Sequence, residues 1–106
     1  MANQYLPTVF AALSDPTRFA VVERLCGGPA SVGQLQTPFA MATPTFLRHL
    51  KVLEKAGLIE TIKRGRVRTC TLKSETLGFA ESWISQRRRA VEAQLDRLQT
   101  YLSEDT

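Results

Sequence analysis

Apolar residues recur with helical spacing over most of this chain. An apolar segment at 4–13 predicts a first short helix. A second helix begins at Asp15, whose side chain can accept hydrogen bonds from free backbone N–H groups, and ends at glycines 27–28. Its expected buried face consists of Phe19, Val22 and Cys26. Ser31 is placed to cap a third, short helix that ends near Gln36.

A fourth helix, at about 43–56, is strongly amphipathic. It begins at Thr43 and Pro44 and stops before Gly57. The apolar side chains that share one face are Phe46, Leu50 and Leu53. The basic side chains on the opposite face are Arg48, Lys51 and Lys55. This helix therefore has one face for a core and another for a partner.

The remaining pattern predicts a β-hairpin and a long helix. Two strand-like runs, 58–63 and 67–72, are joined across a basic turn, Arg64-Gly65-Arg66. From 75 to 103 an apolar stripe follows a/d-like spacing: Leu77, Ala80, Ile84, Val91, Leu95, Leu98 and Leu102. We interpret the helices at 4–13 and 75–103 as dimerisation helices. The alternative is that the long helix packs on its own subunit.

The order helix, short helix, turn, helix and basic hairpin predicts a fold class. It is the order found in a winged helix-turn-helix domain. We expect a single domain over residues 1–106, mainly α with a small β-hairpin. It should contain about five helices and a two- or three-stranded wing at 58–72.

The chain has a formal net charge of +4, and its basic residues are concentrated in one segment. Residues 44–73 hold eight lysine and arginine side chains against two acidic ones, a net charge of +6. The segment before it is neutral and the segment after it is acidic. A solvated charged surface usually mixes both signs, so this segment predicts a polyanionic partner, double-stranded DNA.

Each basic side chain has an expected place on DNA. A helix of about 10–12 Å diameter fits the major groove, which is about 12 Å wide. The start of the fourth helix, with Thr45 and Arg48, would then face base edges, and Lys51 and Lys55 would face phosphates. The basic side chains of the hairpin would follow the backbone or enter the minor groove: Lys63, Arg64, Arg66 and Arg68.

Several motifs with fixed spacing resemble those of the ArsR/SmtB family of bacterial repressors. They span about 13–72 and comprise Leu13-Ser14-Asp15-Pro16-Thr17-Arg18, Pro44-Thr45, Arg48-His49-Leu50-Lys51-Val52-Leu53, Ala56-Gly57-Leu58-Ile59 and Arg64-Gly65-Arg66-Val67-Arg68-Thr69. The resemblance implies a homodimer, repression of an operon, and release from DNA by an inducer. The inducer is left open, as either a small molecule or a redox signal.

The resemblance also argues against metal sensing. Many family members carry a Cys-x-Cys metal site where this chain has Ser31 and Gly33, and His49 is its sole histidine. Zinc and related ions need three or four converging ligands, so we expect no metal and no cofactor. The resemblance instead implies that His49 supports the fourth helix close to DNA.

Two positions depart from the family pattern at the fourth helix. Ala42 and Leu47 stand where family members usually have serines that cap the helix or touch the DNA backbone. Thr43 is expected to replace the missing cap by moving the helix start by one residue. Leu47 has no such substitute.

Two further features each have two interpretations. Cys26 and Cys70 are expected to be reduced and inert, although they could form a redox-sensitive pair if a thiol pKa were lowered, with Arg68 as the neighbouring cation. Trp83 and the arginines 87–89 favour a packed aromatic residue and a solvated patch over a ligand pocket between subunits.

The function predicted is that of a DNA-binding transcriptional regulator, a homodimeric repressor. The alternatives are a thiol-redox-responsive repressor and a winged-helix protein-interaction module that does not read DNA. An enzyme is not expected, because no catalytic triad, carboxylate pair or phosphate-binding glycine loop is present. The uncharged run 25–47 is broken by glycines and prolines, so we expect no membrane segment and a cytoplasmic protein.

Overall fold

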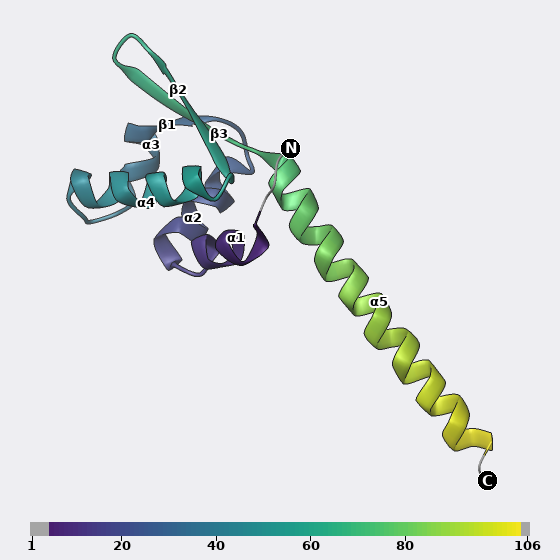
Figure 1. Cartoon of the computed structure of the whole chain (residues 1–106). Coiled ribbons are helices and arrows are strands. Elements are labelled where there is room, and N and C mark those ends of the chain that lie inside the picture. Colours follow the sequence, from purple (N-terminus) through teal and green to yellow (C-terminus); the bar gives the residue numbers. More distant parts are fainter. Residues whose placement is uncertain (1–4, 105–106) are drawn as a thin grey trace.

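The structure is a computed structural model that describes residues 5–104. Its elements are α1 (Leu6–Leu13), α2 (Pro16–Leu25), β1 (Ala30–Ser31), α3 (Val32–Gln36), α4 (Thr43–Lys55), β2 (Ile59–Arg64), β3 (Val67–Leu72) and α5 (Ser74–Glu104). Figure 1 shows α1 to α4 gathered in one body, with the hairpin β2–β3 and the helix α5 projecting from it. The predicted winged helix-turn-helix fold is confirmed. Gln4, which belongs to the first helix predicted, lies outside the described residues.

The hydrophobic core lies where α1, α2, α3 and α4 meet the sheet. Its largest fully buried side chains include Phe46, Leu35, Leu53, Leu58 and Val9. The predicted inner face of α4 is confirmed, because Phe46, Leu50 and Leu53 are all buried.

The predicted inner face of α2 is wrong in part. Phe19 is 51% exposed and Cys26 is exposed, whereas Val21, Val22 and Leu25 are buried. Both sets follow a helical spacing of three and four residues, so periodicity alone could not choose between them. The packing of α2 against α1 and α4 decides the face.

Two predicted helix caps are confirmed. The Asp15 carboxylate accepts a hydrogen bond from the backbone N–H of Arg18 at 3.0 Å. Ser31 and Gln34 form a reciprocal capping box: the Ser31 hydroxyl accepts from the Gln34 N–H, and the Gln34 side chain accepts from the Ser31 N–H. These bonds fix where α2 and α3 begin, and so the direction in which each leaves the preceding turn.

The sheet is antiparallel, with strand order β1-β3-β2. Arg64 faces Val67 across the hairpin, so the loop consists of only Gly65 and Arg66. Gly65 has φ +61°, a left-handed conformation that glycine adopts without strain and that a tight two-residue hairpin requires at its first position. The wing is therefore a short, well-defined ribbon.

Helix α5 starts on the body and then leaves it (Figure 1). Thr76 is fully buried, and its hydroxyl donates a hydrogen bond to the Gly57 carbonyl at the end of α4. Every residue from 86 to 104 is exposed. The alternative, that the long helix packs along its own subunit, is thus contradicted beyond its first three turns. None of the described helices is both long and apolar enough to cross a membrane.

Candidate nucleic-acid interface

The burial of one face of α4 directs its basic face outward. Because Phe46, Leu50 and Leu53 are in the core, Arg48 and Lys51 are held on the exposed side of the helix. The segment before α4 is held by Gln36, whose side-chain amide donates to the Thr43 hydroxyl at 2.9 Å and to the Met41 carbonyl at 3.5 Å.

The predicted role of Thr43 as the cap of α4 is wrong. The N-cap residue is Ala42, and no side chain caps this helix. The Thr43 hydroxyl instead accepts the hydrogen bond from Gln36, so it joins the end of α3 to the first turn of α4. Sequence reasoning missed Gln36, because a contact between two turns seven residues apart leaves no periodic signal.

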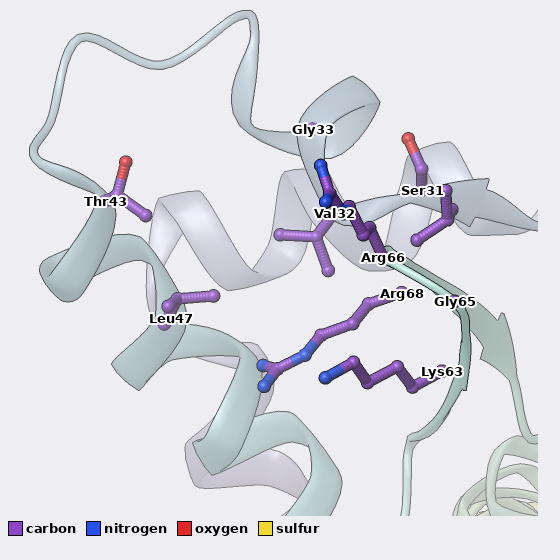
Figure 2. A pocket seen from close by; sticks show the side chains of 10 residues that line it. Ser31, Val32, Gly33, Thr43, Leu47, Lys63, Gly65, Arg66 and Arg68 are labelled. Atoms are coloured by element: carbon purple, nitrogen blue, oxygen red, sulfur yellow. The ribbon is translucent and has the colours of Figure 1, made fainter.

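An open hollow of about 560 Å³ lies between the start of α4, the start of α3 and the wing. Its walls include Ser31, Val32, Gly33, Thr43, Leu47, Lys63, Arg66 and Arg68. Figure 2 shows the Lys63 and Arg68 side chains extending from the wing toward α4, where Leu47 and Val32 point toward each other. The wing and the helix therefore face each other across a space open to solvent.

A second hollow continues the first along α4. It shares Val32, Leu47 and Arg68 with the first. Its charged lining residues are Arg48, Lys51 and Arg68, together with the acidic Glu54. The two hollows together carry five basic side chains from two elements, which we name the cationic face: Arg48, Lys51, Lys63, Arg66 and Arg68. The structure therefore turns α4 and the wing tip to the same side of the molecule.

The hairpin register places two like charges on this face. Lys63 of β2 lies directly opposite Arg68 of β3. Directly opposed like charges destabilise an antiparallel pair, and neither residue has an ion pair with an acidic side chain among the described residues. A ligand with closely spaced negative charges would relieve this repulsion.

Four predicted site residues lie outside the two hollows: Arg64, Thr45, Lys55 and His49. Arg64 lies on the other face of the sheet, with Ile62 and Thr69. Side chains alternate between the faces of a strand, so Arg64 points away from the side that Lys63 occupies. Thr45 and Lys55 are exposed on α4 but line neither hollow.

His49 lies at a junction of three helices. Its Nδ1 atom is 3.2 Å from an Arg18 guanidinium nitrogen and 3.8 Å from the Asp15 carboxylate. The same guanidinium donates to the carbonyls of Ala11 and Ala12 at the end of α1. The hydrogen bond from the backbone N–H of Arg18 lowers the pKa of Asp15, and the nearby His49 adds to this, while partial burial opposes it.

These contacts give His49 and Arg18 a positioning role. Arg18 donates to the Ala12 carbonyl at the C-terminus of α1 and shares the Ala11 carbonyl with Ser14, and it connects this end of α1 to α4 through His49. Sequence reasoning found no carboxylate near His49, because Asp15 lies far from it along the chain. It therefore did not predict this cluster.

The two cysteines differ in their surroundings. Cys26 is exposed at the end of α2, whereas Cys70 is fully buried in β3, opposite Ala30. Burial raises the pKa of the Cys70 thiol, although a hydrogen bond with the Thr61 hydroxyl partly offsets the effect. The pKa of the Cys70 thiol is thus shifted in the direction opposite to the one that a reactive thiol needs.

Comparison with known proteins agrees with this geometry. A helix-turn-helix domain family matches residues 13–62. Transcriptional repressor SdpR of Bacillus subtilis is 30% identical over 76 residues, which cover 72% of this chain and 84% of the repressor. The arsenical resistance operon repressor of Staphylococcus xylosus is also 30% identical, over 74% of this chain and 76% of its own length.

Solved structures give the same result. This chain is 46% identical in sequence to an ArsR family transcriptional regulator of known crystal structure. The two structures match with a TM-score of 0.79, over 82% of this chain and 96% of that one. The chain belongs to the ArsR family. An ArsR-like regulator from Rhodococcus sp. RHA1 is 26% identical, with a TM-score of 0.78, over 90% of both chains. The protein is therefore a transcriptional regulator of ArsR type with a helix-turn-helix DNA-binding domain.

Ser31 and Gly33 occupy the positions at which many family members carry a Cys-x-Cys metal site. Ser31 is used as the cap of α3, and Gly33 lies in the first turn of that helix. Among residues 5–104, no group of three or more histidine, cysteine or acidic side chains is arranged to hold a metal ion.

Proposed function

We propose that this ArsR family protein is a homodimeric repressor that inserts α4 into the major groove of operator DNA. The observation that carries the proposal is the cationic face, on which basic side chains of α4 and of the wing line one continuous open surface. In this arrangement the wing follows the backbone or the adjoining minor groove.

Roles on DNA follow from the position of each side chain along α4. Arg48 is exposed in the second turn, where its guanidinium can form two hydrogen bonds to a guanine. Thr43, Pro44 and Thr45 form the first turn, which faces base edges when the N-terminus of the helix points into the groove. Lys51 and Lys55, further along, are placed for phosphates.

Helices α1 and α5 supply the surface for the second subunit. Phe10 of α1 and Trp83 of α5 make an edge-to-face contact, with ring centroids 6.0 Å apart, and the Arg87 guanidinium lies 5.2 Å from the Trp83 ring. Beyond this contact the apolar stripe of α5 continues in the open: Ile84, Val91, Leu95, Leu98 and Leu102 are each 49–58% exposed. Such a stripe favours pairing with an identical helix.

Footprinting on the DNA upstream of the protein's own gene tests the proposal. We expect protection of a palindrome whose half-sites lie about one helical turn apart. Arg48→Ala should relax base preference at one position of each half-site, at a cost of about 1–3 kcal/mol. A selection that enriches no sequence from genomic DNA would instead support a protein-interaction module.

A further inference from the structure

Leu47 is an apolar side chain at the centre of a cationic surface. It lies in the second turn of α4, where it is half-buried and packs in part against the core. Both hollows contain it, together with Val32 and Arg68. Figure 2 shows Leu47 directed across the hollow toward Val32, with the Arg68 guanidinium nearby. The open surface between α4 and the wing thus has an apolar floor, basic walls and one acidic lining residue, Glu54.

The two kinds of side chain fit different parts of a duplex. The basic walls fit phosphate oxygens and guanine acceptors, whereas an apolar surface gains nothing from either. Of the groups that base pairs present in the major groove, the C5-methyl of thymine is the apolar one. A leucine beside Arg48 and Lys51 is therefore suited to a thymine and not to a phosphate.

We propose that Leu47 reads the C5-methyl group of one thymine in each operator half-site, with Val32 supporting it from α3. This inference rests on the proposed function, in which α4 lies in the major groove. Leu47 then acts as a specificity-determining residue. Leu47, whose side chain can neither cap the helix nor bind a phosphate, thereby contributes to base recognition.

The test replaces thymine by deoxyuridine, one position at a time, in the footprinted operator. Deoxyuridine keeps the pairing edge and the O4 acceptor and lacks only the methyl group. With the unaltered protein we expect one position per half-site to lose about fourfold in affinity, the value for one methyl-sized apolar contact. Fluorescence anisotropy titration at constant salt measures the loss.

Two variants assign that effect to Leu47. In Leu47→Ala, and in Leu47→Gln, which keeps the length of the side chain, thymine and deoxyuridine at that position should bind equally well. The matched control is Val52→Ala, because Val52 is exposed on α4 but lines neither hollow. It should preserve the fourfold difference.

The outcomes separate the two proposals. If the unaltered protein binds the operator and no thymine is sensitive to loss of its methyl group, this inference is overturned and the proposed function stands. The inference also fails if a sensitive position is found and both Leu47 variants keep the difference. If the unaltered protein protects no DNA, the proposed function itself fails.

Discussion

Asp15 shows how one side chain can both start a helix and hold its neighbours. Its carboxylate caps α2, and it lies 3.8 Å from His49 on the helix that faces DNA in our proposal. The ionised form is the one that accepts the N–H bond and attracts a protonated imidazole. The pKa of Asp15 is therefore lower in the folded protein than in the unfolded chain.

This lowered pKa predicts a pH dependence of stability. Asp15 contributes stability that is fully present above its unfolded pKa and is lost as the pH falls through the folded pKa, so the loss begins at about pH 4 and continues below it. Asp15→Ala should cost about 1 kcal/mol in free energy of unfolding at neutral pH, the usual loss for a helix cap. Urea unfolding at several pH values measures both effects.

Asp15→Asn is the matched control. An asparagine can still cap α2 but does not titrate, so this variant should keep most of the stability at pH 7 and lose part of the decline below pH 4. An identical acid profile in the unaltered protein and in Asp15→Asn would contradict the role given to this carboxyl group.

At the scale of the elements, the wing combines a defined turn with an unfavourable charge pair. Lys63 and Arg68 lie opposite each other on the side that faces α4. Arg68→Thr should therefore raise Tm by about 1–2 °C at low salt, because it removes the repulsion and adds a residue suited to strands. The same change should weaken DNA binding.

Thermal melts at low and at high salt check this expectation. The gain in Tm should shrink as salt screens the charges. The control is Val67→Thr, which changes no charge. Val67 is exposed and lies next to Arg68 in the strand. A variant Arg68→Thr that is less stable than the unaltered protein at low salt would show that the charge pair is not a source of strain.

The elements themselves were largely predictable from the sequence, and their contacts were not. Strong local signals marked the starts of α2 and α3 and the amphipathic α4, and these are confirmed. The hairpin also lies where it was predicted, but its loop is shorter than the expected Arg64-Gly65-Arg66, because Arg64 pairs with Val67 as the last residue of β2. The inner face of α2 was mistaken, because two apolar stripes with the same spacing compete there. Lys63 and Arg64 point to opposite faces of the sheet because side chains alternate along a strand. This was not predicted, because the sequence did not show that Arg64 belongs to the strand and not to the turn.

The contacts that position α4 had no signature in the sequence. The bonds from Gln36 to Thr43 and from Arg18 to His49 join segments whose approach depends on the packing of several helices. The role expected of Thr43 was wrong for the same reason, since a neighbouring helix end supplied a partner for its hydroxyl.

At the scale of the whole molecule, α5 gives the protein its elongated shape. The dimensions are 71 × 32 × 22 Å, and the outer part of α5 contacts no other described element (Figure 1). Apolar side chains at Leu95 and Leu98 are more than half exposed there. We expect this stripe to be covered in the dimer.

The double substitution Leu95→Glu and Leu98→Glu should therefore separate the subunits. Burying each leucine contributes about 1.5–3 kcal/mol, so the double variant should weaken dimerisation by at least a hundredfold. The matched control places two glutamates on the opposite side of α5, at Ala93 and Thr100, which adds the same charge. Sedimentation equilibrium measures both, and equal dimer affinities would contradict a dimer built on this stripe.

The salt dependence of operator affinity tests the central claim most directly, namely that α4 and the wing bind one polyanion together. We expect log K to fall linearly with log salt concentration, and Lys51→Ala and Arg66→Ala each to reduce the slope by about one unit. Arg64→Ala, which removes a charge from the other face of the sheet, should leave the slope unchanged. A slope near zero, or equal slopes for the unaltered protein and both variants of the cationic face, would contradict the account.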